Sequence, residues 1–369
     1  MAHVALAMPG TTKLSVLDLI PVSEGQTSAD AIAASRRLVQ RADELGYHRY
    51  WVAEHHNTEL VASTTPPVLL AALGAGTSRI RLGSGGVMLP NHAPFVVAEQ
   101  FAALESVYPG RIDLGLGRAP GTDPFTAAAL RRDLSRDRVD EFPNDVLELM
   151  GFLGDVRDEH DREVLNRLRV TPGAATHPQI WLLGSSLYGA ELAAAFGLPY
   201  TFAHHFAMHA DPKAAADHYR EHFVPSPVLA EPHFMVSVSA ISADTVEEAT
   251  RLALPSRAAM HQIRFGRPTR VLTPDGAAAY AARMQDRSLF DATTGTQLVG
   301  TPEMVADGID RLVERTGADE VLLAATTHDV EVRIRTIEAL AELRDPAAWE
   351  SRDSAGRASR AWVGAHPHN

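Results

Sequence analysis

The sequence contains no cysteine. Disulfide bonds, a thiolate nucleophile and thiolate ligands for a metal ion are therefore excluded. Positive charge is also scarce, because 34 lysines and arginines stand against 46 aspartates and glutamates, which gives a formal net charge of -12. A chain of this charge repels nucleic acids and anionic membranes, so we expect neither as a partner.

Long apolar runs are missing as well. No stretch approaches the roughly 20 apolar residues that a membrane-spanning helix needs. The first residues show no basic segment leading into an apolar core, as a secretory signal would. We therefore expect a cytoplasmic protein without a membrane segment.

Short apolar runs that are typical of strands alternate with segments of helical spacing. The eight expected strands lie at 14–20, 50–53, 80–89, 112–117, 179–183, 200–203, 234–241 and 320–325. This alternation predicts an α/β fold, a single-domain (β/α)8 barrel of the TIM type over residues 1–345. A doubly wound sheet is the alternative, but no Gly-x-Gly-x-x-Gly follows the first strand. Residues 256–299 break the rhythm and are expected to form an inserted lid, and 346–369 a mobile tail.

The carboxyl ends of the expected strands share a chemical character. In a barrel of this type the active site lies at those ends. Polar or titratable side chains, or glycines, follow most of the strands: Asp18, Glu54-His55-His56, Gly85-Gly86, Gly117-Arg118, Ser185-Ser186, His204-His205 and Thr326-Thr327-His328. We expect these residues to meet at one rim of the barrel and to form the functional site.

Arg118 and Ser186 together fit a phosphate site. An arginine offers a planar fork that suits phosphate or carboxylate. A serine before a helix adds a hydroxyl and free backbone N–H groups. A salt-bridged arginine and an ordinary helix cap are the alternatives. A phosphate site would imply a phosphorylated cofactor or substrate.

The paired histidines allow several interpretations. His55 could be a packing histidine at a strand end, and a metal site built from His55, His56 and Glu59 is conceivable. Adjacent residues of an extended chain point to opposite faces, which argues against a shared metal ion. For the same reason, at most one of His204 and His205 can face the site. A serine hydrolase lacks support, because the sequence contains no Gly-x-Ser-x-Gly motif.

Three longer motifs stand out. They are Tyr50-Trp-Val-Ala-Glu-His-His-Asn57, Gly83-Ser-Gly-Gly-Val-Met-Leu-Pro-Asn-His92 and Gly110-Arg-Ile-Asp-Leu-Gly-Leu-Gly-Arg-Ala-Pro-Gly121, and Phe196-Gly-Leu-Pro199 and Gly300-Thr-Pro-Glu303 accompany them. In this order, over about residues 13–345, the sequence resembles the bacterial luciferase-like flavin-dependent monooxygenases. The resemblance implies a (β/α)8 barrel that binds reduced FMN at the carboxyl ends of its strands and forms a homodimer.

The resemblance also implies which residues bind the cofactor. By position, Arg118 and Ser186 would hold the FMN phosphate, with the backbone of Gly189 nearby. The link between Gly85 and Gly86 corresponds to a non-proline cis peptide beneath the flavin ring. These five residues are the expected cofactor contacts, and no metal is expected.

His55 corresponds to the catalytic histidine of luciferase. Two positions depart from that pattern. Gly117 stands where luciferase has a reactive cysteine, which argues against light emission from aldehydes. Gly189 stands where a threonine contacts the phosphate.

The resulting hypothesis is a monooxygenase. Reduced FMN, delivered by a separate flavin reductase, would react with O2 at flavin C4a, and the peroxyflavin would oxygenate a small organic substrate with His55 as general acid or base. The resemblance extends to relatives in bacterial secondary metabolism, including antibiotic biosynthesis. The alternatives are an F420-dependent dehydrogenase, a non-catalytic flavin-binding barrel and a metal-dependent barrel hydrolase. The Glu54-His55-His56 motif favours FMN over F420.

Overall fold

The computed structural model describes residues 12–119, 122–131, 140–157, 167–207, 210–265, 268–285 and 287–344, so the expected tail at 346–369 lies outside the described residues. The strands are β1 (Lys13–Asp18), β2 (Arg49–Val52), β3 (Arg81–Met88), β4 (Ile112–Gly117), β5 (Gln179–Gly184), β6 (Tyr200–Phe202), β7 (Phe234–Ser242), β8 (Gln297–Gly300) and β9 (Glu320–Ala324). The α-helices are α1 (Ser28–Glu44), α2 (Pro66–Gly74), α3 (Pro94–Val107), α4 (Pro124–Arg131), α6 (Phe142–Phe152), α8 (Leu187–Phe196), α9 (Pro212–Glu221), α10 (Val246–Phe265), α11 (Pro274–Ala282), α12 (Ser288–Ala292), α13 (Pro302–Thr316) and α14 (Val330–Arg344). Two short 3-10 helices, η1 (Leu89–Asn91) and η2 (Thr293–Thr296), also lie in the described part of the chain.

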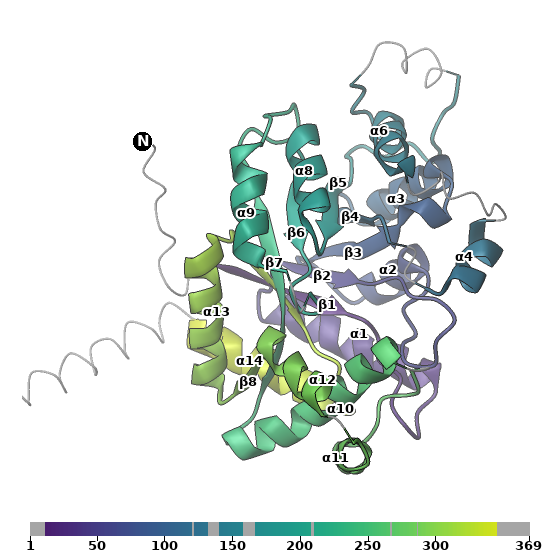
Figure 1. The fold of residues 1–369 in the computed structure, drawn as a ribbon. Coiled ribbons are helices and arrows are strands. Elements are labelled where there is room, and N and C mark those ends of the chain that lie inside the picture. Colours follow the sequence, from purple (N-terminus) through teal and green to yellow (C-terminus); the bar gives the residue numbers. More distant parts are fainter. Residues whose placement is uncertain are drawn as a thin grey trace, which may run out of the picture.

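The strands form a closed parallel barrel. Each strand from β1 to β6 pairs with the following strand, so the order runs from β1 to β7. The ring closes because β7 pairs with β9 and β9 pairs with β1. Parallel neighbours need crossover connections, and helices supply them. Figure 1 shows the strands at the centre with the helices around them. The prediction of a single-domain (β/α)8 barrel is confirmed.

Alternate residues of the strands fill the barrel interior. On β2, Trp51 and Ala53 belong to the inner cluster, whereas Tyr50 and Val52 pack with the surrounding helices. Trp51 meets Trp181 of β5 edge to face, with 5.3 Å between the ring centroids. Both tryptophans are fully buried and pack in the barrel interior.

A polar layer closes the amino-terminal end of the barrel. Arg49 donates to Asp113 over 2.8 Å and to Glu320 over 3.0 Å. Arg81 pairs with Asp113 Oδ1 at 2.6 Å. Trp51 Nε1 donates to Asp113 Oδ2, the oxygen that Arg49 also contacts, over 3.0 Å. Buried charges are tolerated when they are paired and hydrogen-bonded in this way. The opposite, carboxyl end of the barrel is therefore the end that can open to a ligand.

Glycine allows β3 and β4 to approach closely. A Cβ on Gly115 would lie 2.1 Å from the carbonyl oxygen of Ser84, so no larger residue fits there. Ser84 Oγ bridges the two strands, since it donates to Gly115 O over 2.9 Å and accepts from Gly115 N over 3.0 Å. The register shifts between Ser84 and Val87, as at a β-bulge. The Gly85–Gly86 link lies at this irregularity.

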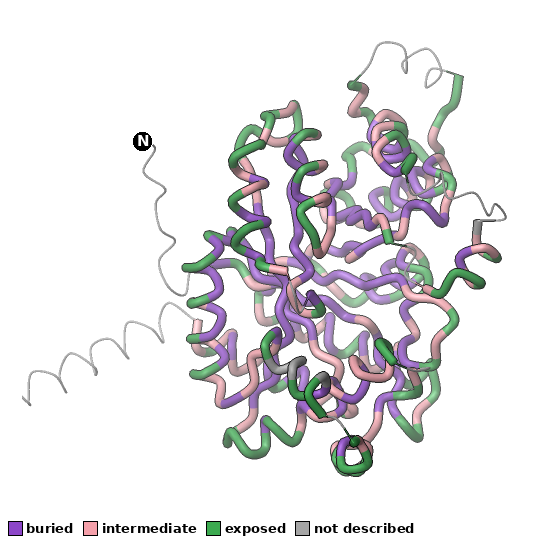
Figure 2. The backbone as a smooth tube through the Cα atoms, viewed as in Figure 1, coloured by how far each residue is buried: buried purple, intermediate pink, exposed green. Residues whose placement is uncertain are grey.

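Side chains cap the starts of several helices. The Thr27 hydroxyl accepts from the backbone of Asp30, and the Asp30 carboxylate accepts from the backbone of Thr27, so α1 begins with a capping box. Thr301 caps α13 ahead of Pro302. Figure 2 shows the central strands buried and the outward faces of the helices exposed.

Residues 245–300 differ from the sequence prediction. The sequence predicts a helix end at Leu254, but α10 continues through Pro255 to Phe265. Ala258 and Ala259 are buried beyond the proline. Burial of this face offsets the hydrogen bond that a proline removes from a helix. The sequence also fails to predict β8, which pairs in parallel with β7 outside the closed ring.

The charged helical stretch expected at 125–160 is divided in the structure. Its described parts are α4 and α6, and the rest falls on 132–139 and 158–166, outside the described residues. In the described part of the chain, no helix is long and apolar enough to cross a membrane.

Candidate active site

A cavity of about 530 Å³ opens at the carboxyl ends of the barrel strands, and every strand of the closed ring, or the residue directly after it, contributes to its lining. The expected catalytic histidine and the five expected cofactor contacts all line this one cavity: His55, Gly85, Gly86, Arg118, Ser186 and Gly189. Among the described residues, no aspartate or glutamate lines it. The cavity therefore lies where barrel enzymes have their active sites.

Arg118 follows β4 at the rim of the cavity. Its guanidinium lies over the ring of Tyr188, with Cζ 3.9 Å from the ring centroid. In the described part of the chain it makes no ion pair or hydrogen bond, so the salt-bridged alternative does not hold there. Stacking on the ring restricts the side chain while its N–H donors remain available to an anion.

Ser186 is the N-cap residue of α8, but its side chain makes no capping hydrogen bond. The hydroxyl and the backbone N–H groups of the first helical turn therefore remain available to a ligand. Gly189 lies in that first turn. A Cβ there would lie 3.1 Å from Tyr200 Cε2 and 3.3 Å from Gly184 Cα. This close packing explains why glycine, rather than threonine, suits position 189.

Three glycines make one wall of the cavity from bare backbone. The peptide bond between Gly85 and Gly86 is cis, as the resemblance implies. A Cβ on Gly86 would lie 2.8 Å from the carbonyl oxygen of Gly115. A Cβ on Gly117 would lie 3.0 Å from Met88 Sδ, so a cysteine at that position would require Met88 to shift.

The two histidines after β2 point in different directions, as predicted. His55 lines the cavity, and its Nδ1 is buried without a hydrogen-bond partner in the described part of the chain. Burial lowers the pKa of His55, and the Glu54 carboxylate opposes this shift only in part. The imidazole is therefore neutral near pH 7. His56 and His92 instead hydrogen-bond Glu54 Oε1, over 2.9 and 2.8 Å.

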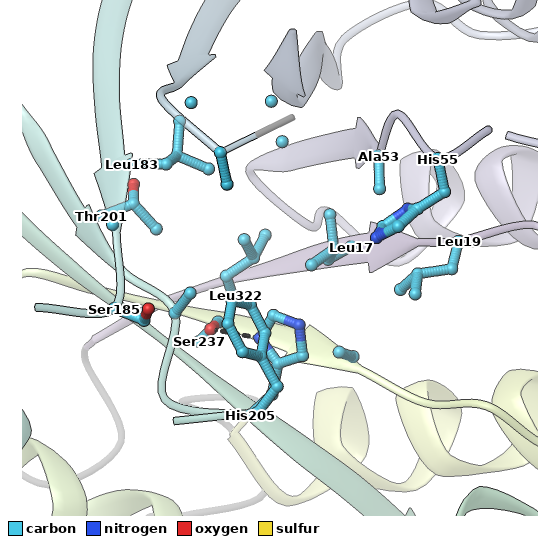
Figure 3. Close-up of a pocket in the computed structure, with 18 of the residues that line it drawn as sticks. Leu17, Leu19, Ala53, His55, Leu183, Ser185, Thr201, His205, Ser237 and Leu322 are labelled. Carbon is cyan, nitrogen blue, oxygen red and sulfur yellow. Dashed lines mark hydrogen bonds between the residues drawn. The ribbon is translucent and has the colours of Figure 1, made fainter. Parts of the chain in front are cut away.

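His205 reaches the cavity from the end of β6. Its Nδ1 lies 2.6 Å from Ser237 Oγ of β7. Burial, with smaller contributions from His55 and His204, lowers the pKa of His205 to about 3. His204 does not line the cavity, so one histidine of this pair faces the site, within the predicted limit. Figure 3 shows His55 and His205 directed into the cavity from different strands.

Asp18 does not belong to the site, although its place near a strand end predicts that it does. Its buried carboxylate pairs with Arg333 at 2.7 Å and accepts from the hydroxyls of Ser35 and Tyr50. The neighbouring Leu17 lines the cavity, and the alternation of side chains along β1 directs Asp18 outward, toward α1 and α14. Asp18 therefore links β1 to α1 and α14 through an ion pair and hydrogen bonds.

The cavity also contains residues that carry no signal in the sequence. Examples are Tyr188, Thr201, Ser237 and Ser239. The expected lid segment contributes Ser256, Ala259, Met260, Ile263, Arg264 and Gln297. The described residues of the 256–299 segment thus cover one side of the cavity, and the role of this segment as a lid stays a prediction.

Comparison with known proteins agrees with this arrangement. The chain is 42% identical over 341 residues to the uncharacterized protein YvbT of Bacillus subtilis, which covers 92% of this chain and 98% of the relative. It is 40% identical over 336 residues to a luciferase-like monooxygenase of Escherichia coli, with 91% and 98% covered. It is 36% identical over 301 residues to the N-acetyl-S-alkylcysteine monooxygenase of Bacillus subtilis, with 81% and 88% covered.

Solved structures share the fold. The crystal structure of apo-MsnO8 superposes with a TM-score of 0.81 at 35% identity, over 90% of this chain and 98% of that one. The oxygenating constituent of a Pseudomonas putida 3,6-diketocamphane monooxygenase, solved with FMN, superposes with a TM-score of 0.63 at 21% identity, over 90% of this chain and 97% of that one. An F420-dependent secondary alcohol dehydrogenase superposes with a TM-score of 0.63 at 15% identity, over 89% of this chain and 99% of that one. The sequence pattern of the luciferase-like monooxygenases matches residues 12–320, and the chain belongs to that family.

Proposed function

We propose that the protein is an FMN-dependent monooxygenase. It takes reduced FMN from a separate flavin reductase and uses O2 to oxygenate a small organic substrate. The observation that carries this proposal is that three groups line one apolar cavity: an arginine without an ion pair among the described residues, a helix start without a side-chain cap, and a neutral histidine. When bound, reduced FMN supplies the activation of oxygen.

The rim of the cavity fits the FMN phosphate. Arg118 can donate two parallel hydrogen bonds to phosphate oxygens, and the contact with the Tyr188 ring restricts its guanidinium. The Ser186 hydroxyl and the N-terminal N–H groups of α8 add further donors. No carboxylate lines the described cavity to repel a dianion. Gly85 and Gly86 line the cavity without side chains, so a flat ring system could lie against their backbone.

His55 would handle the proton that oxygen transfer requires. Its neutral imidazole can accept a proton from the substrate or return one, because its buried Nδ1 has no other partner in the described chain. Leu17, Leu19 and Leu322 line the same cavity. Apolar walls of this kind exclude water from a reactive site.

Rapid mixing tests the proposal. Reduced FMN and protein are combined without oxygen, then mixed with oxygenated buffer, and the absorbance of oxidised flavin is followed. We expect oxidised flavin to return more slowly than it does without protein, and to return with oxygenated product when a substrate is added. Reoxidation at the rate of free flavin would contradict the proposal. Titration with F420 would then separate an F420-dependent dehydrogenase from a flavin-binding barrel without catalysis.

We also propose a homodimer formed through α2 and α3. Val68 of α2 and Val96 and Val107 of α3 are 65%, 48% and 62% exposed. Exposed apolar residues on neighbouring helices are typical of an interface. Light scattering is expected to give twice the mass of the chain, and Val68→Glu to lower it. A monomeric wild type would contradict this proposal.

A further inference from the structure

One side of the cavity carries hydroxyl groups and an imidazole that the expected cofactor contacts do not use. We name Thr201, His205 and Ser237 the β6–β7 wall, because they lie on or directly after these two strands. Leu17 and Leu322 line the cavity as well, so polar and apolar surfaces share one space. Figure 3 shows both kinds of side chain.

Two contacts of the Ser237 hydroxyl favour one tautomer of His205. Ser237 Oγ lies 2.6 Å from His205 Nδ1 and 3.3 Å from the carbonyl oxygen of Phe202. A hydroxyl has one proton to donate, and a carbonyl can only accept. Both contacts are hydrogen bonds at once only if Ser237 donates to Phe202 and accepts from Nδ1–H of His205. Nε2 then carries a lone pair and acts as an acceptor.

Thr201 adds a second group that needs a partner. The residue is 1% exposed, and its Oγ1 has no hydrogen-bond partner in the described part of the chain. It lines the cavity from the middle of β6. A buried hydroxyl left without a hydrogen bond is costly, which favours a ligand that satisfies it.

Resting on the proposed function, we propose that the β6–β7 wall binds the hydroxyl-bearing end of the organic substrate. The substrate hydroxyl donates to His205 Nε2, and the Thr201 hydroxyl bonds an oxygen at the same end of the molecule. The substrate is thus an uncharged, largely apolar compound that carries a hydroxyl group. A cationic amine finds no carboxylate among the described cavity residues. Ser237 acts as a positioning residue for His205.

Nitrogen-15 NMR of histidine-labelled holoenzyme tests the tautomer. His205→Gln assigns the signals, because its spectrum lacks those of His205. We expect wild-type His205 to carry its proton on Nδ1 and none on Nε2, and Ser237→Ala to lose this preference. A proton on Nε2 of the wild-type protein would overturn the proposal, whatever the flavin chemistry proves to be.

Paired probes test recognition of the hydroxyl. The pairs are phenol with anisole, cyclohexanol with methoxycyclohexane, and 2-naphthol with 2-methoxynaphthalene. Binding is followed by the absorbance change of oxidised FMN in the holoenzyme, and by ligand-observed NMR with the cofactor-free protein. We expect the hydroxyl member of at least one pair to bind up to about tenfold more tightly than its ether, the worth of one hydrogen bond. Equal binding of both members, or binding of no pair, overturns the proposal.

Two variants assign the effect. Thr201→Val removes the Thr201 hydroxyl and should weaken binding of the hydroxyl probe while leaving the dissociation constant of FMN unchanged. The matched control is Ser256→Ala, since Ser256 also lines the cavity but already accepts from Gln297 over 3.0 Å. A Thr201→Val protein that loses FMN affinity would assign the wall to the cofactor instead. Neither readout needs reduced flavin or O2, so this inference and the proposed oxygenation can fail separately.

Discussion

Arg118 offers a sharp test of how the protein would hold its cofactor. The guanidinium is stacked on Tyr188 at 3.9 Å and has no ion pair in the described chain, so its removal disturbs little else. Arg118→Ala should therefore weaken FMN binding without unfolding the barrel. Arg118→Lys keeps the charge but loses the planar fork, so its affinity for FMN should lie between those of wild type and Arg118→Ala.

The magnitude follows from the contacts. Loss of a charge-assisted hydrogen bond costs about 1.5–3 kcal/mol, which is a rise of about 10- to 150-fold in the dissociation constant. The ring contributes less. A cation–π contact at a partly exposed site is worth about 0.5–1 kcal/mol, so Tyr188→Leu should raise the constant by about two- to fivefold.

Fluorescence titration of FMN measures these constants, with thermal unfolding as a check on folding. Arg251→Ala is the matched control, because Arg251 is an arginine of α10 that pairs with Glu248 and Asp275 and does not line the cavity. An unchanged constant for Arg118→Ala would refute the phosphate assignment. An equal loss in Arg251→Ala would show that net charge, rather than a local contact, explains the effect.

Three other changes have expected outcomes. His55→Ala should keep FMN affinity but slow oxygenation by about 10²- to 10⁴-fold, the usual contribution of a general acid or base, and unchanged turnover would remove His55 from the reaction. The pKa of His205 is about 3 when folded, so the unfolded chain, with an ordinary histidine pKa, binds the extra proton as the pH falls below about 6.5, and stability decreases. Between pH 7 and 5, wild type should lose about 2 kcal/mol more than His205→Gln in urea unfolding, and parallel pH profiles would contradict the assignment. Asp113→Asn should cost about 3–5 kcal/mol, because Arg49 and Arg81 lose their shared buried carboxylate, and urea unfolding that matches wild type would show that the layer does not stabilise the barrel.

The barrel could be predicted because its signal is repeated. Each strand is a short apolar run followed by a helix, and closure of the eight strands follows from that alternation. The expected strand at 50–53 is shifted by one residue from β2, and the expected strand at 320–325 is one residue longer than β9. Where the signal is not repeated, prediction fails. β8 is only four residues long, lies outside the ring and is only partly buried.

Pro255 shows why a local rule can be overruled. A proline in a helix interior removes one hydrogen bond and favours a helix end at the preceding residue. In α10 the helix continues, because Ala258 and Ala259 beyond the proline are buried against the rest of the protein. Tertiary packing of this kind is not contained in the local sequence.

The candidate site was predictable where chemistry and position coincide. Arg118 and Ser186 are unusual residues at strand ends, and both line the cavity. Tyr188 and Thr201 are ordinary residues, and nothing in the sequence separates them from core residues of the same type. Their importance depends on distances, such as the 3.9 Å between the Arg118 guanidinium and the Tyr188 ring.

Asp18 and His55 show what decides membership of the site. Both stand at strand ends, yet Asp18 is turned toward the helices and His55 toward the cavity. The deciding quantity is the parity of the position along the strand, because successive side chains face opposite ways. One residue known to face the barrel interior is enough to tell which positions of a strand face inward. On β2, Trp51 faces the interior, and the residues two and four positions later, Ala53 and His55, line the cavity.

The same alternation accounts for the β6–β7 wall only in part. On β6 and the residue after it, Thr201 and Ala203 line the cavity at a spacing of two. The backbone then enters a turn, and both His205 and Phe206 line the cavity, whereas His204 does not. A shift of one residue in the β6 register would therefore turn Thr201 away from the cavity, whereas the turn after β6 decides which histidine faces it.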